Sequence, residues 1–92
     1  MDQRVRARVK VYGVVQGVYF RGAAQEEARH LGLDGWVSNR PDGSVEAVFE
    51  GPEYAVREAV EWMSHGPTSA IVEHIVTEWE EPTGETGFGL RY

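Results

Sequence analysis

The sequence predicts an α+β fold in which an antiparallel sheet carries two helices on one face. Three observations lead to this prediction. Several short segments alternate between apolar and polar residues with the period of two that strands show. Two other segments repeat apolar residues every three or four positions, as helices do. These segments follow one another in the order strand, helix, strand, strand, helix, strand.

Residues 4–12 form the first predicted strand, because apolar residues alternate there with a basic row made of Arg4, Arg6, Arg8 and Lys10. We interpret this row as a solvated sheet face in preference to a binding surface. Residues 13–20 form a glycine-flanked turn. A helix over residues 21–32 follows, since its apolar residues lie three or four positions apart, and Gly32 is a natural stop.

Two further strands are predicted over residues 35–39 and 44–50, joined by the turn Arg40-Pro41-Asp42-Gly43. Gly51-Pro52-Glu53 opens a second helix, with proline in its first turn and an acid near its positive end, and Gly66-Pro67 ends it. Residues 71–80 read as a strand, 82–87 as a loop and 88–92 as a last short strand. This order is that of the ferredoxin-like split βαβ fold.

Length and composition are those of one globular domain, which we expect to span residues 1–92. The chain is 41% hydrophobic and 26% charged, and a chain of this length buries roughly 65% of the surface that its unfolded form exposes. No apolar run approaches the roughly 18 residues of a membrane span. No apolar signal core follows the first residues. There is no cysteine, which excludes disulfides, thiolate metal sites and cysteine nucleophiles and favours the cytoplasm.

The charge of the chain limits the kinds of partner. Nine Lys and Arg against 15 Asp and Glu give a net charge of −6, which argues against a protein that holds nucleic-acid phosphates. The charge is uneven, however, because residues 1–21 hold five basic side chains and one acid. A small anion can therefore be held near this N-terminal part.

The turn from Gly13 to Arg21 is the first candidate for chemistry. It joins a strand to a helix start, where backbone N–H groups lack partners and can converge on an anion. Gly17 permits backbone angles that other residues resist, and Arg21 adds a planar cation suited to phosphate or carboxylate. A plain turn with a surface arginine explains the same residues. The pattern is neither a P-loop nor a Rossmann fingerprint.

Asn39 is the second candidate. It stands at a strand end before Arg40-Pro41, where its amide can orient a water or a substrate oxygen, or simply form the turn. The remaining polar and aromatic residues are weaker candidates. The histidines His30, His65 and His74 lack metal-ligand spacing. The acids Glu78, Glu80, Glu81 and Glu85 read as a solvated edge, and the tryptophans Trp36, Trp62 and Trp79 as packing residues.

Two segments of the chain resemble the signatures of the acylphosphatase family. The first is VYGVVQGVYFR, over residues 11–21, and the second starts as GWVSNRPDGSV at residue 35 and continues to Gly51. The ending FGLRY, over residues 88–92, is similar to the usual close of the family. The likeness spans the whole chain. It departs from the family pattern at Ser38, where many members carry a larger side chain, and at Gly89.

The resemblance implies hydrolysis of the carboxyl–phosphate bond of acyl phosphates without a metal or an organic cofactor. It implies that Arg21 binds the phosphoryl group and that Asn39 holds the attacking water. The backbone N–H groups of one run would line the phosphate cradle, namely those of Gln16, Gly17, Val18, Tyr19, Phe20 and Arg21. These residues suit the hydrolysis of an acyl phosphate. The carboxylate leaves without protonation, and phosphoryl transfer depends mainly on positioning and on stabilisation of charge.

The expected partners are a small acyl phosphate and the phosphate product, with no nucleic acid and no membrane, and the expected state is a monomer. Three alternatives stay open. One is a module of a larger assembly, as similar domains are in hydrogenase maturation proteins. Another is RNA binding on the open sheet face, although the RNA-recognition pattern is missing and Glu46 and Glu50 would repel phosphates. The third is a phosphate- or anion-binding module without turnover.

Overall fold

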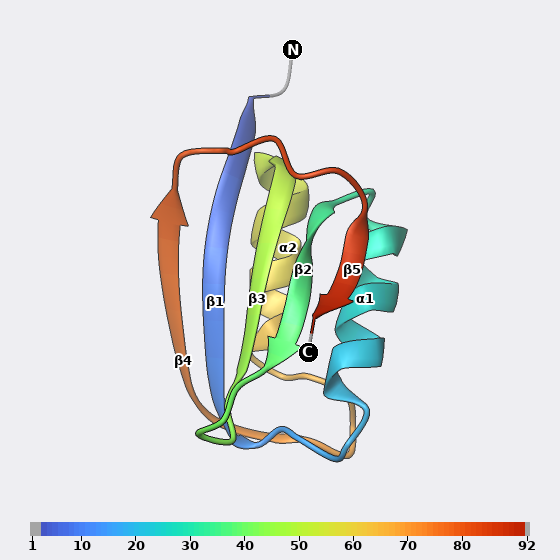
Figure 1. The fold of residues 1–92 in the computed structure, drawn as a ribbon, viewed down its shortest axis with the longest axis vertical. Coiled ribbons are helices and arrows are strands. Elements are labelled where there is room, and N and C mark those ends of the chain that lie inside the picture. Colours follow the sequence, from blue (N-terminus) through green and yellow to red (C-terminus); the bar gives the residue numbers. More distant parts are fainter. Residues whose placement is uncertain (1–2, 92) are drawn as a thin grey trace.

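Seven elements pack into two layers in the computed structural model, which describes residues 3–91 (Figure 1). In chain order they are β1 (Arg4–Val14), α1 (Phe20–His30), β2 (Asp34–Asn39), β3 (Val45–Pro52), α2 (Glu53–Met63), β4 (Ile71–Glu80) and β5 (Phe88–Arg91). The strands form one sheet in the order β4-β1-β3-β2-β5, and both helices cover the same face of it. The predicted split βαβ arrangement is confirmed.

The pairing of the strands brings two predicted motifs to one end of the sheet. β3 lies antiparallel between β1 and β2, so that β1 and β2 run in the same direction and end at the same edge. The last segment adds a fifth strand, β5, which runs parallel to β2. Stacked rings of Phe49 and Phe88, 5.4 Å apart, hold β5 against the core. Tyr92 of the predicted last strand lies outside the described residues.

Several element boundaries differ from the sequence prediction by one or two residues, and those of β1 and α1 bear on the turn between them. β1 continues through Gly13 and Val14, which were predicted to start the turn, because both residues pair with β4 after a shift of register. A side chain at Gly13 would place its Cβ 2.1 Å from the carbonyl oxygen of Ile71, so only glycine allows this approach. α1 begins one residue earlier than predicted, at Phe20, and ends at His30, since Leu31 already forms its C-terminal cap.

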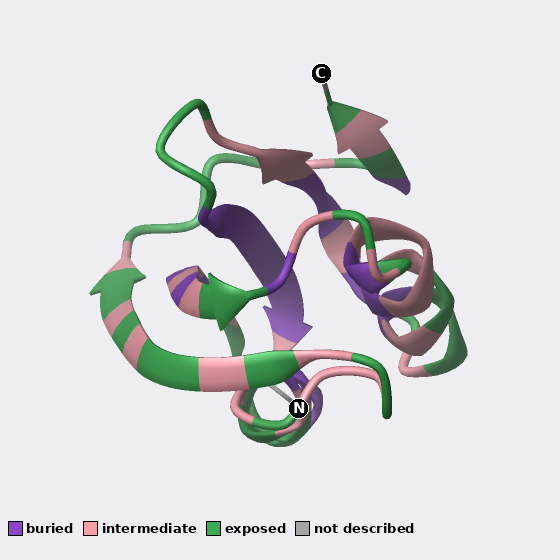
Figure 2. Cartoon of the chain, turned by 90° about the horizontal axis from the view of Figure 1, so that it is seen from below, coloured by how far each residue is buried: buried purple, intermediate pink, exposed green. Residues whose placement is uncertain are grey.

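Small apolar residues let the helices lie close to the sheet. The core is built from alternate residues of the central strands, such as Val9 and Phe49, and from the helix residues Ala24, Ala28, Ala55, Val56 and Ala59. Figure 2 shows β3 buried along nearly its whole length, whereas the edge strand β4 alternates between half-buried and exposed residues. None of the helices within residues 3–91 is long and apolar enough to cross a membrane.

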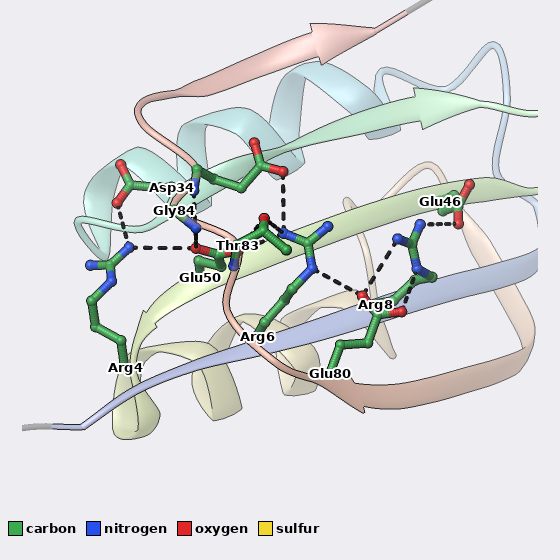
Figure 3. A network of polar contacts seen from close by, with 10 residues as sticks. Arg4, Arg6, Arg8, Asp34, Glu46, Glu50, Glu80, Thr83 and Gly84 are labelled. Atoms are coloured by element: carbon green, nitrogen blue, oxygen red, sulfur yellow. Dashed lines mark hydrogen bonds and ion pairs between the residues drawn. The ribbon is translucent and has the colours of Figure 1, made fainter.

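The basic row of β1 is solvated only in part, because Arg4 is exposed, Arg8 and Lys10 are half-buried and Arg6 is buried. Arg6 is 6% exposed, and its guanidinium donates to Glu50 at 2.5 Å and to Glu80 at 2.9 Å (Figure 3). The prediction of solvation is wrong for Arg6 because the register of β1 places it between Glu50 on β3 and Glu80 on β4. Of the acids predicted to form a solvated edge, Glu78 and Glu81 are exposed, whereas Glu80 and Glu85 are half-buried and paired with Arg6. Arg6 and Arg8 are therefore paired with acids of the neighbouring strands.

Glu50 anchors the connection from β4 to β5. Its side chain is fully buried, and its carboxylate accepts hydrogen bonds from the backbone N–H groups of Thr83, Gly84 and Glu85 at 2.8, 3.1 and 3.1 Å. Burial raises the pKa of Glu50, but these hydrogen bonds and the one from Arg6 outweigh it and hold the pKa at about 2. The carboxylate thus stays ionised and fixes the segment that leads into β5.

The tryptophans behave in two ways. Trp36 is 8% exposed and lies between the guanidiniums of Arg8 and Arg91, which are 5.7 and 4.3 Å from its ring centre. Trp62 packs edge-on against Phe20. Packing is therefore confirmed for these two. Trp79 lies outside the core, 47% exposed, with the guanidinium of Arg57 4.9 Å from its ring.

Candidate active site

A cavity of about 240 Å³ lies at the end of the sheet where β1 and β2 finish. Figure 1 shows the turn from β1 to α1 passing this end of the molecule, close to the end of β2. The cavity is lined by Val15, Gly17, Tyr19, Phe20, Arg21, Gly22, Asn39 and Leu90. The fold thus brings Arg21 and Asn39, which are 18 residues apart in the sequence, to one cavity.

The turn before α1 has a backbone shaped to receive an anion. Gly17 and Tyr19 have positive φ angles of 75° and 64°, and alternation of this kind turns successive N–H groups toward a common point. For tyrosine the left-handed conformation costs about 1–2 kcal/mol. Within residues 3–91, the N–H groups of residues 17–20 have no acceptor in the protein, since the first such bond runs from Ala23 to the Tyr19 carbonyl at 3.0 Å.

The charge at the start of α1 favours a bound anion. No acid stands in its first turn and no side chain caps it, whereas the first turn of α2 contains Glu53. Arg21, which lines the cavity, adds a positive charge at this positive end of the helix dipole. An anion in the cavity would interact favourably with this charge and with the N–H groups of the turn.

Arg21 is held at the cavity by the last strand. Its Nη1 donates to the backbone carbonyl of Arg91 at 3.3 Å, and the neighbouring Leu90 lines the cavity. β5 therefore has two functions at this end of the sheet. It closes one wall and orients the guanidinium.

The side chain of Asn39 is available to a ligand. Other groups hold the turn that follows it, because Arg40 and Ser44 are bonded through their backbones at 2.8 Å and Asp42 accepts from the Ser44 N–H at 2.9 Å. Among the described residues, nothing bonds to the Asn39 side-chain amide, whereas the Asn39 backbone carbonyl accepts a hydrogen bond from the Ser38 hydroxyl. The turn-forming role considered for Asn39 is thus filled by its neighbours.

Gln16 and Val18 are placed differently from the other residues of the predicted cradle. The side-chain amide of Gln16 donates to the carbonyls of Arg40 and Ser44, at 2.8 and 2.9 Å. It ties the turn to the segment that follows Asn39. The carbonyl of Val18 accepts from the Ser69 hydroxyl at 2.9 Å. Neither residue lines the cavity, so any contribution they make to it comes through the backbone.

Three contributors to the site have no separate signal in the motif pattern. Leu90 and the Arg91 carbonyl come from β5, and only the position of that strand in the sheet reveals them. Gly22 lines the cavity because it has no side chain, and a Cβ there would lie 2.2 Å from the Tyr19 ring. Within residues 3–91, no group of three His, Asp or Glu is placed as a set of metal ligands.

Comparison with known proteins assigns the chain to a family. The sequence model of the family described as Acylphosphatase matches residues 7–90. The chain belongs to the acylphosphatase family. An acylphosphatase from Gloeobacter violaceus is 52% identical over 88 residues, which are 96% of this chain and 95% of that protein. The crystal structure of acylphosphatase from Bacillus subtilis is 39% identical and has a TM-score of 0.92, covering 96% of this chain and 99% of that one.

Some of the similar proteins share only the fold of this chain, whereas others share its family and activity. Full-length HypF, in its phosphate- and nucleotide-bound form, contains a region that matches the whole chain with a TM-score of 0.92, but it is 22% identical and covers 12% of HypF. This likeness shows the fold alone. Relatives at about 50% identity over nearly the whole chain are acylphosphatases. The protein is accordingly an enzyme that hydrolyses acyl phosphates, and a binding module without turnover is not favoured.

Proposed function

We propose that Arg21 and the backbone N–H groups of residues 16–21 hold the phosphoryl group of the substrate and that Asn39 holds the attacking water. The observation that carries this proposal is the shared cavity. Arg21, Asn39 and the turn with two left-handed residues line one space of about 240 Å³. Such a space accepts a group of the size of phosphate and leaves room for a water molecule.

The proposed reaction needs no general acid. The water oxygen forms a bond to phosphorus while the bond from phosphorus to the acyl oxygen breaks, and the carboxylate leaves as a weak base. The negative charge on the equatorial phosphoryl oxygens is stabilised by Arg21 and by the N–H groups of the turn. The water loses its proton to a phosphate oxygen of the substrate. Asn39 holds this water in place, so its translational and rotational entropy is already lost before the reaction.

We expect wild-type protein to release phosphate from benzoyl phosphate at an undiminished rate when EDTA is present. The residues assigned to the reaction supply positive charge from a guanidinium and from backbone dipoles, and their positions are fixed by the fold. The measurement is loss of benzoyl phosphate, corrected for its spontaneous decay, with and without chelator. An activity that vanishes with EDTA and returns with a divalent cation would contradict the assigned roles.

We expect Asn39→Ala to lower kcat by roughly 10²-fold, because the water is no longer positioned. The inhibition constant of inorganic phosphate should change by less than about twofold, since the groups that bind phosphate are retained. Ser38→Ala is the matched control, because the Ser38 side chain bonds the backbone carbonyl of Asn39 but neither lines this cavity nor contacts the Asn39 amide. Equal losses of turnover and phosphate binding in Asn39→Ala would instead make Asn39 a phosphate-binding residue.

We also propose that the enzyme works as a monomer in the cytoplasm. One copy of the chain brings Arg21, Asn39 and the turn together in one cavity, which is the arrangement that a monomeric enzyme needs. The lack of cysteine fits a reducing compartment. The pairing of Arg6, Arg8 and Arg40 with acids on the open sheet face speaks against RNA as a partner.

A further inference from the structure

The acyl half of the substrate has no place assigned to it so far. Among the described residues, a hollow of about 460 Å³ along β5 shares only Leu90, at the wall of the cavity, with the cavity. Two other surfaces lie beside the proposed water and phosphate positions. One is a wider hollow of about 580 Å³ on the open sheet face, lined by Trp36, Ser38, Asn39, Arg40, Pro41, Glu46 and Arg91. The other is the rim of the cavity at the start of α1, where Tyr19 and Gly22 stand.

The geometry of phosphoryl transfer disfavours the wider hollow. The attacking and leaving oxygens lie roughly in line on opposite sides of phosphorus. If Asn39 holds the water, the acyl group leaves from the side away from Asn39. The wider hollow shares Asn39 with the cavity and so lies on the water side. The acyl group should therefore meet the rim at α1.

Tyr19 is the exposed side chain at this rim. Of the residues that line the cavity, Val15 and Phe20 are buried, Arg21, Gly22, Asn39 and Leu90 are half-buried, and Gly17 has no side chain. Tyr19 by contrast is 65% exposed. Any group that protrudes from the cavity on this side passes its ring.

The ring of Tyr19 is held in one orientation. Its hydroxyl donates to Glu26 at 3.0 Å, two turns along the helix, and one side of the ring covers Gly22, whose Cβ position is 2.2 Å from it. The hydroxyl is engaged by Glu26, so the open part of the ring is apolar. A flat apolar surface fixed in this way favours a flat or extended apolar ligand.

We propose that Tyr19 is a platform for the acyl group and makes the enzyme select acyl phosphates with aromatic or extended apolar acyl groups over short ones. The proposal rests on the phosphate and water positions proposed above. An aromatic acyl group lies on the exposed side of the Tyr19 ring while its phosphate occupies the cradle. An acetyl group offers the ring much less apolar area than an aromatic acyl group does.

The test compares kcat/KM for benzoyl phosphate with kcat/KM for acetyl phosphate. Tyr19→Asn removes the ring and keeps a residue that tolerates the left-handed backbone. We expect the ratio of the two values to fall roughly three- to tenfold, the range of one aromatic contact. Tyr54→Asn is the matched control, because Tyr54 is 68% exposed on α2 and lies outside the cavity. It should leave the ratio unchanged.

Gly22→Ala tests the same inference without a substitution at Tyr19, because it moves the tyrosine ring instead of removing it. Alanine suits the helix interior, but its Cβ would collide with the ring and displace it. We expect the ratio to fall here too. The inhibition constant of inorganic phosphate, measured for each variant, reports whether the cradle is intact.

The outcomes separate the inference from the proposed function. A lowered ratio in Tyr19→Asn and Gly22→Ala, with phosphate inhibition kept within about twofold, supports the platform. An unchanged ratio overturns it. A lower ratio accompanied by an equally large loss of phosphate inhibition also overturns it, since Tyr19 would then only shape the cradle. A wild type that hydrolyses neither substrate overturns the proposed function and the inference together. Arg21→Ala, which should slow both substrates equally, leaves the ratio as it is.

Discussion

Arg21→Ala should lower kcat/KM for acyl phosphates by about 10²–10³-fold or more, the cost of losing one stabilising contact to transition-state charge. Among the described residues that line the cavity, Arg21 is the one with a cationic side chain. Arg21→Lys should also be poor, because an ammonium cannot donate two parallel hydrogen bonds to phosphoryl oxygens. Steady-state hydrolysis of benzoyl phosphate measures both variants.

Folding of Arg21→Ala should be preserved. The hydrogen bond from Arg21 to the Arg91 carbonyl lies at the exposed surface, so its loss costs little. We expect the free energy of unfolding to stay within about 1 kcal/mol of wild type. Inorganic phosphate should raise the Tm of wild type by mass action and should no longer do so in the variant.

Arg29→Ala is the matched control for Arg21→Ala. Arg29 stands on the same helix and also donates to a carbonyl of β5, that of Phe88, at 3.2 Å, but it does not line the cavity. Its loss should leave turnover near the wild-type value. If Arg21→Ala kept most of its activity while folded, or if Arg29→Ala were equally inactive, the role given to Arg21 would be wrong.

Glu50→Gln should destabilise the protein by about 3–5 kcal/mol, since it removes one partner of a buried ion pair and leaves the other without its closest counter-charge. Arg6, 6% exposed, would lose the carboxylate to which it donates at 2.5 Å. Three backbone N–H groups of the β4–β5 connection would lose an ionised acceptor as well. Urea unfolding at neutral pH measures the change.

The same variant should alter the response to acid. The folded-state pKa of Glu50 is about 2, below the value of roughly 4.3 for an unfolded glutamate. The native state therefore binds fewer protons than the unfolded state between these values, and stability falls as pH falls through this window. A shift of this size corresponds to about 3 kcal/mol. Above roughly pH 5 the contribution is complete and constant.

Unfolding free energies measured from pH 6 down to 2 test this contribution. Wild type should lose stability steeply below roughly pH 4.5, and Glu50→Gln should show a shallower fall. Glu81→Gln is the control, because Glu81 is an exposed carboxylate of the same connecting segment. Parallel pH profiles for wild type and Glu50→Gln would show that Glu50 is not the source of the acid sensitivity.

The sequence predicts the order of the elements well because each element has its own local pattern. The period of two in residues 4–12 and the spacing of Phe20, Ala24 and Ala28 depend only on neighbours. The boundary at Gly13 depends on β4, nearly sixty residues away, which supplies the carbonyl of Ile71. No local pattern contains that contact, so the strand end was predicted too early.

The same division holds for the site. The signatures predict Arg21, Asn39 and the turn as chemical groups, and the fold places the residues of both signatures around one cavity. The burial of Arg6 was missed because a basic alternating strand has the same local appearance whether solvent or acids face it. Only the cross-strand register, which sets Arg6 against Glu50 and Glu80, distinguishes the two cases.

The position of Arg21 beside β5 has a consequence for how the enzyme acquires activity. The site combines residue 21 near the start of the chain, residue 39 in the middle and the carbonyl of residue 91 near the end. β5 joins the sheet beside β2 across about fifty residues of intervening chain, and contacts between such distant segments are among the slower ones to form. Turnover is therefore a property of the fully assembled sheet, and a partly folded chain that has already formed its cradle would still lack the wall that orients the guanidinium.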